Sequence, residues 1–147
     1  MTDIDLVGEA IAAREGAYAP YSRFAVGAAL LDSTGKVWHG CNIENAAYTP
    51  GNCAERTAFF KAVSEGVFSF EAIAVVGGPV GEPIGDWCAP CGVCRQVMRE
   101  FCDPRRFRVV LANSPTVTRG FLLEDLLPMS FGPEDLSSPA RSVEAGA

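Results

Sequence analysis

The sequence has no hydrophobic run long enough to cross a membrane, because no stretch approaches the roughly 20 apolar residues that a spanning helix needs. It also lacks the basic start of a signal peptide, since its first residues, MTDIDLVGEA, carry early acids. These two absences predict a chain that stays in the cytoplasm and has no membrane partner. In that compartment its six cysteines are expected to remain reduced.

Basic residues are also few. The chain has 12 Lys and Arg against 18 Asp and Glu, a net charge of −6, and no basic run. Its one local cluster, Arg105-Arg106 with Arg108, is expected to be solvated surface. Proteins that bind nucleic acid use clustered cations to neutralise phosphates. We therefore expect no nucleic acid partner.

The length and patterning predict one domain. The chain has 147 residues, of which 48% are hydrophobic, and no linker divides it. We assign residues 1–136 to a single domain and expect the small, polar tail at 137–147 to be disordered. Strand and helix patterns alternate along the domain, which is typical of an α/β sandwich. Helices are expected at 3–16, from about 52, and at about 91–102, with strands at 25–31, 36–41, 72–76, 107–112 and 117–121 and a Gly/Pro-rich loop at 77–85. In the first helix, the expected inward stripe is Ile4, Val7, Ile11 and Ala12.

Two short cysteine motifs carry the chemistry, Cys53-Ala54-Glu55 and Pro90-Cys91-Gly92-Val93-Cys94. Cys91 and Cys94 lie at i and i+3 in the first turn of an expected helix, and Cys53 holds the same place in another helix. Helix N-termini stabilise thiolates. Three thiolates leave the fourth position of a tetrahedral zinc ion open, which is typical of catalytic zinc.

A structural zinc site is the alternative, with Cys88 as a fourth ligand, because Cys88 forms a second C-x-x-C with Cys91. Glu55 favours the catalytic interpretation. It falls on the same helix face as Ala58, Phe59 and Ala62, where a carboxylate is costly unless it is paired or functional.

The runs Cys53–Ala58 (CAERTA) and Cys91–Val97 (CGVCRQV), with Asn42-Ile43-Glu44-Asn45, resemble the small single-domain cytidine deaminases. The similarity extends over about residues 21–134. It implies a three-layer α/β/α sandwich with a mixed five-stranded sheet and helices on both faces. It also implies one Zn²⁺ per subunit, held by three cysteines, and a homotetramer whose sites are completed across subunits. The loop Gly85–Cys88 departs from the commoner, shorter approach to the second motif.

The reaction implied by this resemblance is the hydrolytic deamination of cytidine and deoxycytidine to uridine and deoxyuridine, a step of pyrimidine salvage. Zinc-bound hydroxide would attack C4, Glu55 would shuttle protons, and ammonia would leave. Arg56 matches an arginine that donates hydrogen bonds to the ligand sulfurs, which offsets the charge of three thiolates. Gln96 is a further candidate beside the metal ligands, with packing as its alternative role.

Several matched positions are expected to contact the nucleoside. Asn42 and Glu44 correspond to residues that bind the ribose 3′-hydroxyl, and alternation along an extended strand places them on one side. Phe24 matches a base-stacking phenylalanine, with core packing as the alternative. Ala54 is a further expected substrate contact.

Three more positions are expected to act across a subunit boundary. Ala46 and Tyr48 match contacts to the 5′-hydroxyl that a neighbour provides. Phe131 resembles the aromatic that closes a neighbouring pocket, although a Phe near a C-terminus could equally pack on its own core.

Three rival functions share parts of this pattern. A blasticidin S deaminase has the zinc signature but lacks the Asn-x-Glu-Asn run in this form. A polynucleotide deaminase would need basic grooves and aromatic platforms. A zinc-stabilised scaffold protein would have no use for Glu55, so replacing that residue would spare its function.

Overall fold

Five strands form one mixed sheet in the computed structural model, which describes residues 1–136. The strand order is β2-β1-β3-β4-β5. β3 and β4 are parallel, and the other neighbouring strands are antiparallel. The strands are β1 (Phe24–Asp32), β2 (Val37–Cys41), β3 (Phe70–Pro79), β4 (Arg108–Ala112) and β5 (Thr118–Leu122).

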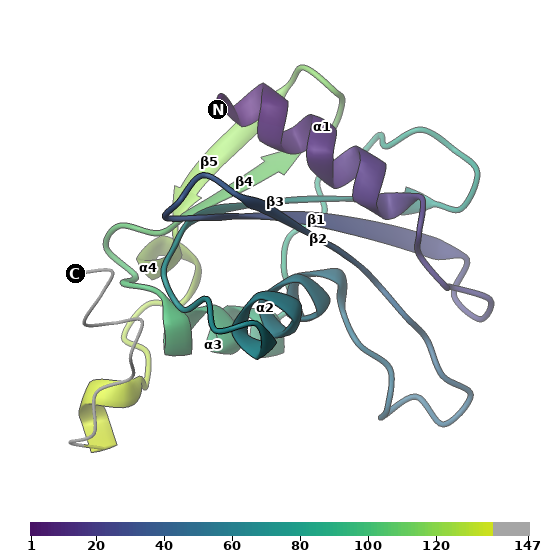
Figure 1. Cartoon of the computed structure of the whole chain (residues 1–147). Coiled ribbons are helices and arrows are strands. Elements are labelled where there is room, and N and C mark those ends of the chain that lie inside the picture. The colour runs from purple at the N-terminus through teal and green to yellow at the C-terminus, as the bar shows by residue number, and fades with distance from the viewer. Residues whose placement is uncertain (137–147) are drawn as a thin grey trace.

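Helices cover both faces of this sheet (Figure 1). Helix α1 (Asp3–Arg14) packs on one face, against β1 and β3, and α2 (Ala54–Ser64) and α3 (Gly92–Phe101) lie on the other. The short helices α4 (Leu123–Leu126) and η1 (Pro133–Leu136) follow β5. The predicted three-layer α/β/α fold is therefore confirmed. The disordered tail predicted at 137–147 lies outside the described residues. Among residues 1–136, no helix is long and apolar enough to span a membrane.

The central strands bury side chains on both faces, because successive residues of a strand point to opposite sides. Leu30, Ile73 and Val109 face α2 and α3, where they join a core with Phe59 and Met98. Their neighbours along the strands face α1 and are mostly smaller, namely Ala29, Ala74 and Val110. α1 thus packs close to the sheet.

The predicted inward stripe of α1 is wrong in two of its four residues. Ile4 is 49% exposed and Ala12 is also exposed, whereas Leu6, Ala10 and Ala13 are buried. The helix is oriented so that the small residues Ala10 and Ala13 face the sheet, which allows α1 to lie close to it. It begins at a capping box in which the Thr2 hydroxyl accepts from the Asp5 amide.

β3 is longer than predicted and extends into the expected loop. Gly77 and Gly78 pair with Val26 and Ala25 of β1, so the strand runs on to Pro79. Glycine is a poor strand former in isolation. Pairing with a central partner strand overrides this preference here.

The turn between β1 and β2 is built around the carboxylate of Asp32, which is 1% exposed. It accepts hydrogen bonds from the Thr34 amide (2.8 Å), the Thr34 hydroxyl (2.6 Å), the Lys36 amide (3.1 Å) and Trp38 Nε1 (3.0 Å). These donors outweigh the effect of burial, and the pKa of Asp32 lies below its usual value. The hairpin is therefore fixed by an ionised side chain.

Gly40 of β2 allows α2 to lie directly against the sheet. A β-carbon at this position would overlap the carbonyl oxygen of Ala54 and the amide nitrogen of Ala58. The first turn of α2 is thereby fixed in place. That turn begins at Cys53.

Candidate metal and substrate site

Three cysteines meet where α2 and α3 begin. Cys53 is the N-cap of α2, Cys91 is the N-cap of α3, and Cys94 lies in the first turn of α3. Their sulfur atoms all lie within 4.8 Å of one another. As the sequence predicted, two helix N-termini bring their free N–H groups and positive dipole ends to one point.

The spacing of these sulfurs fits zinc. Sulfurs that bind one tetrahedral zinc ion at about 2.3 Å lie about 3.8 Å apart. The Cys53 sulfur is 3.9 Å from that of Cys91, which is 3.6 Å from that of Cys94. Cys94 is buried, Cys53 is half-buried and Cys91 is exposed, so the cluster reaches the surface at Cys91.

The electrostatics of the cluster favour a thiolate at Cys53. Hydrogen bonds from the Cys94 thiol and from Arg56 lower the pKa of Cys53 to about 5, although burial opposes them. The same contact with Cys53, together with burial, raises the pKa of Cys94. One sulfur is thus ready to bind a cation at neutral pH, and the others release their protons on binding.

Arg56 supplies positive charge to these sulfurs. Its Nη2 lies 3.3 Å from the Cys53 sulfur. Its Nε is buried and has no hydrogen-bond partner among the described residues. A guanidinium this close stabilises thiolates, which fits a metal centre whose ligands carry three negative charges.

Cys88 is not part of the metal cluster. The group of mutually close sulfurs within residues 1–136 consists of Cys53, Cys91 and Cys94. Burial, and then the charges of Glu55 and Cys53, raise the pKa of Cys88 to about 11. The four-cysteine alternative is therefore not supported, and Cys88 instead lines the cavity beside the cluster.

Glu55 is the buried carboxyl of this site, with an exposed fraction of 4%. It lies on the predicted face of α2, with Ala58, Phe59 and Ala62 all fully buried. Burial is the main cause that raises its pKa, and the charge of Cys53 adds to it. A carboxyl with a raised pKa exchanges protons more readily near neutral pH.

One cavity of about 590 Å³ joins the metal cluster to the loops around the start of β1 and the end of β2. Glu55, Cys53 and Cys91 line this cavity, and so do Asn42 and Glu44. The volume is in the range of small-molecule sites. The full lining set is Tyr21, Ser22, Val26, Asn42, Ile43, Glu44, Asn45, Tyr48, Gly51, Asn52, Cys53, Ala54, Glu55, Arg56, Cys88, Ala89 and Cys91.

Asn42 and Glu44 follow β2 and are fixed by hydrogen bonds. The Asn42 side chain accepts from the Val26 amide (2.8 Å) and donates to the Phe24 carbonyl (2.8 Å), which ties it to β1. Glu44 accepts from the amides of Tyr21 (2.9 Å) and Ser22 (3.1 Å) and from the Ser22 hydroxyl. The Ser22 hydroxyl and amide are the main causes that lower the pKa of Glu44. An ionised acceptor thus lines the cavity.

Comparison with known proteins agrees with this geometry. Residues 1–111 match the model of a family described as the cytidine and deoxycytidylate deaminase zinc-binding region. The chain belongs to this deaminase family. It is 53% identical over 136 residues to a cytidine deaminase of Sporosarcina psychrophila, covering 92% of this chain and 96% of that protein. It is also 42% identical over 144 residues to a cytidine deaminase of Mycobacterium tuberculosis, covering 96% of this chain and 100% of that protein.

Solved structures give the same result for the fold. A crystal structure of cytidine deaminase from Burkholderia pseudomallei is similar with a TM-score of 0.79 and 53% identity, covering 89% of this chain and 100% of that one. The cytidine deaminase structure from M. tuberculosis has a TM-score of 0.72 at 39% identity, covering 90% and 99%. The three-cysteine cluster of this deaminase fits the zinc-binding region that the family model describes.

Two contributors to the deaminase site were missed in the sequence. Tyr21 and Ser22 hold the Glu44 carboxylate through backbone and hydroxyl groups. They precede it by more than 20 residues, and backbone donors leave no trace in side-chain identity. The identities of these two residues alone gave no signal of the contact.

Of four other predicted substrate contacts, Ala54 and Tyr48 line the cavity, whereas Phe24 and Ala46 are not among its lining residues. Phe24 lies over Gly77, where a β-carbon would be 3.0 Å from its Cε1 and 2.7 Å from the Cys88 sulfur. Ala54 is fully buried and lines the cavity. Tyr48 lines it with a side chain that is 78% exposed and a backbone φ of 61°. Ala46 is exposed and is not among the residues that line the cavity.

Phe131 and Gln96 lie together beside the middle of α3. The Phe131 side chain is 58% exposed and is not among the residues that line the cavity of its own chain. The Gln96 side-chain amide donates to the Phe131 carbonyl oxygen at 2.9 Å. This bond holds the segment after α4 on α3.

Proposed function

We propose that the protein catalyses the hydrolytic deamination of cytidine and deoxycytidine to uridine and deoxyuridine, with release of ammonia. The observation that carries this proposal is a single cavity lined by the buried Glu55, by Cys53 and Cys91 of the three-cysteine cluster, and by Asn42 and Glu44. Relatives named cytidine deaminase, similar over most of the chain, support the same reaction. The reaction belongs to pyrimidine salvage.

Cys53, Cys91 and Cys94 would hold the zinc ion, which when bound supplies a Lewis acid that acidifies a water ligand. Glu55 accepts the proton of the attacking water and delivers it to N3 of the pyrimidine. A C–O bond forms at C4. The C–N bond then breaks as Glu55 carries the remaining proton of the new C4 hydroxyl to the departing amine, which leaves as ammonia while the C4 carbonyl of the product forms. The raised pKa of Glu55 supports this double role as base and acid. Arg56 holds the Cys53 thiolate throughout.

The sugar is assigned to the end of the cavity that Asn42 and Glu44 line. Both side chains are held in place by β1 and its preceding loop, so they are prepared to meet a hydroxyl without reorganising. An ionised Glu44 repels a phosphate, which favours nucleosides over nucleotides. Phe24 is assigned to stacking on the base, and Ala54 to a contact with it.

A homotetramer is the proposed assembly. Ala46 and Tyr48 are exposed, and the Phe131 ring lies outside its own cavity, which supports contacts of these residues with a neighbouring subunit. The proposed compartment is the cytoplasm, because thiol ligands must stay reduced to bind zinc.

The test is the ultraviolet absorbance change of cytidine and of deoxycytidine, with zinc content measured on the same samples. Glu55→Gln is the active-site variant, and Glu71→Gln, at an exposed position near the start of β3, is its matched control. We expect turnover of both substrates by the native protein and by Glu71→Gln. Glu55→Gln is expected to keep its zinc and to lose about 10²–10⁴-fold in kcat.

Two further substrates separate the rival functions. Blasticidin S turnover without cytidine turnover would move the proposal to that class of deaminase. A folded, zinc-loaded native protein that converts no nucleoside, with Glu55→Gln at least as stable, would instead favour a zinc scaffold. Cytidine monophosphate is expected to be a poor substrate, because its phosphate meets the charge of Glu44.

A further inference from the structure

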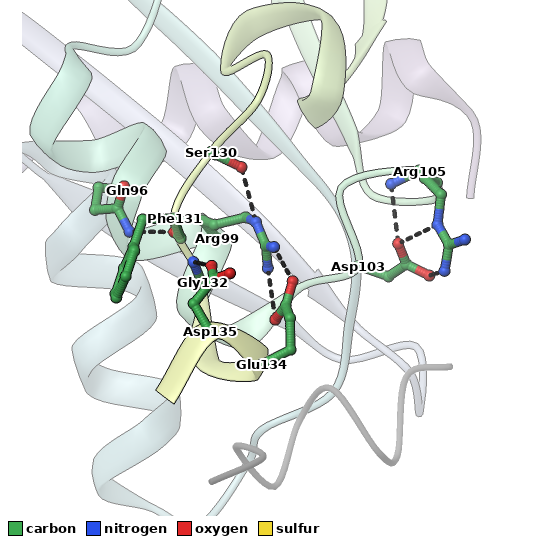
Figure 2. A network of polar contacts seen from close by, with 9 residues as sticks. All are labelled: Gln96, Arg99, Asp103, Arg105, Ser130, Phe131, Gly132, Glu134 and Asp135. Atoms are coloured by element: carbon green, nitrogen blue, oxygen red, sulfur yellow. Dashed lines mark hydrogen bonds and ion pairs between the residues drawn. The ribbon is translucent and has the colours of Figure 1, made fainter. Parts of the chain in front are cut away.

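The segment after α4 is fastened to α3 by one buried arginine. Arg99 is 6% exposed, and its guanidinium donates to the Ser130 hydroxyl at 2.8 Å and to both carboxylate oxygens of Glu134 (Figure 2). The hydrogen bond from Arg99 is the main cause that lowers the pKa of the Glu134 carboxyl. A two-oxygen contact of this kind fixes direction as well as distance.

Gly132 lies flat against the same guanidinium. A β-carbon at this position would overlap Cζ and both terminal nitrogens of Arg99. The backbone is therefore in direct contact with the arginine plane. The Asp135 carboxylate also accepts from the Gly132 amide at 2.8 Å, which closes the turn before η1.

Phe131 lies between the two residues that Arg99 holds. Gln96 of α3 binds its carbonyl oxygen, so the backbone is fixed on both sides. Figure 2 shows the ring on the opposite side of the segment from the Arg99 guanidinium, and 58% of the side chain is exposed. A large apolar ring on a rigid backbone, unburied in its own chain, is suited to contact another molecule.

We propose that Arg99 is a positioning residue for the deamination reaction: it holds residues 130–134 on α3 so that the Phe131 ring is presented to the substrate cavity of a second copy of this chain. The inference rests on the proposed function, in which Phe131 closes a neighbour's site. Cys91 is the N-cap of α3 and Cys94 lies in its first turn, so the helix that holds the Phe131 segment also carries two metal ligands of its own chain. Without Arg99, residues 130–134 would have to lose conformational entropy each time substrate binds in the neighbouring cavity, which would weaken binding.

A double-mutant cycle tests whether Arg99 acts through Phe131. Loss of an aromatic contact with the base lowers affinity about tenfold, so Phe131→Ala is expected to raise KM by about that factor. Arg99→Gln is expected to raise KM similarly, with kcat less affected. The double variant is expected to match Phe131→Ala alone, because a ring that is absent cannot be misplaced. Amide hydrogen exchange at 130–136 is expected to rise in Arg99→Gln.

Two other variants keep the test decisive. Gly132→Ala places a β-carbon against the guanidinium and is expected to raise KM as Arg99→Gln does. This variant tests the proposal if Arg99→Gln does not fold. Arg105→Gln is the matched control. Its ion pair with Asp103 lies in the same region, and the hydrogen bonds of its guanidinium in Figure 2 go to Asp103 and not to residues 130–134. The KM of Arg105→Gln is therefore expected to equal that of the native protein.

Mixed oligomers test the direction of the contact. Arg99→Gln subunits are co-expressed with an excess of Glu55→Gln subunits, which are inactive but carry an intact Phe131. The active sites of the Arg99→Gln subunits are expected to recover the native KM, because their neighbours now present the ring. Unchanged, raised KM in the mixture would overturn the proposal.

The outcomes distinguish the two levels of inference. An inactive native protein would overturn the proposed function and this proposal with it. An active native protein for which Arg99→Gln leaves KM unchanged would overturn only the positioning role. The same holds for a double variant whose KM rises by the product of the two single effects.

Discussion

The guanidinium of Arg56 stands one turn above the Cys53 sulfur, with Nη2 at 3.3 Å from it and Nε buried without a hydrogen-bond partner among the described residues. Both residues belong to the start of α2, so the contact needs no other element. One N–H group of the Arg56 guanidinium thus lacks a hydrogen-bond partner within residues 1–136, while another donates to the Cys53 sulfur. We therefore assign Arg56 the role of stabilising the thiolate in the metal centre.

Replacing Arg56 is expected to weaken that centre without emptying it. In Arg56→Gln the positive charge beside Cys53 is lost, and partners of this kind are worth about 10–100-fold in metal affinity or activity. We expect kcat/KM to fall within that range, and zinc to be removed by a weaker chelator. Competition with a metal indicator measures the affinity, and Arg108→Gln, whose ion pair is with Asp3 far from the site, is the control. Equal zinc affinity and activity in Arg56→Gln would contradict this reading of the contact.

Zinc content separates the three-cysteine site from a four-cysteine one. Cys88 lies outside the sulfur cluster, so Cys88→Ser is expected to retain about one zinc per chain, as one three-cysteine cluster predicts. Cys91→Ser is expected to lose most of its zinc, because it removes a ligand. Elemental analysis after extensive dialysis measures both. If Cys88→Ser also came out depleted of metal, the assignment of ligands would have to change.

Asp32 is expected to make stability depend on pH in the acidic range. Its pKa is lowered in the folded chain, so its contribution is present above the unfolded value of about 3.9 and is lost as pH falls through the lower folded value. Asp32→Asn is expected to lower the free energy of unfolding at pH 7 by about 1.5–3 kcal/mol, as for hydrogen bonds to a charged group. Urea unfolding measures this difference, which is expected to shrink below pH 4. A constant difference across pH, or one shared by the exposed Asp86→Asn, would argue against the ionised turn.

Gly40→Ala is expected to disturb the metal site indirectly, by displacing α2. The added methyl overlaps the backbone of Ala54 and Ala58, so α2 must move away from β2 and carry Cys53 with it. Overpacking of this kind costs about 1–3 kcal/mol. We expect a lower melting temperature together with weaker zinc binding. Gly8→Ala, in an open position on α1, is the control and is expected to be neutral or slightly stabilising. If Gly40→Ala lowered the melting temperature but left zinc affinity unchanged, the loss of stability would be independent of the metal site and the prediction would be wrong.

Much of the fold was predictable because its signals are local. The hairpin at Asp32–Lys36 and the helices that start at the cysteine motifs follow from turn residues and short periodic runs. The placement of Cys53, Cys91 and Cys94 at two helix N-termini followed in the same way. The inward face of Glu55 could be derived from four residues of one helix.

Other features depend on partners that are distant in sequence. Arg99 is buried on α3, which a hydrophobic pattern does not predict, because its partners Ser130 and Glu134 come from beyond β5. Arg14 is buried for the same reason, since it donates to backbone carbonyls of residues 25, 78, 79 and 82. Carbonyl acceptors have no residue identity, so no sequence motif can report them.

The two halves of the metal cluster are separated in the chain by β3, which lies at the centre of the sheet. Cys53 comes before this strand, and Cys91 and Cys94 come after it. The cluster therefore cannot form in any fragment that ends before α3. A growing chain can complete its zinc site only once α3 has been made, so a bound ion would link the segments on the two sides of the central strand.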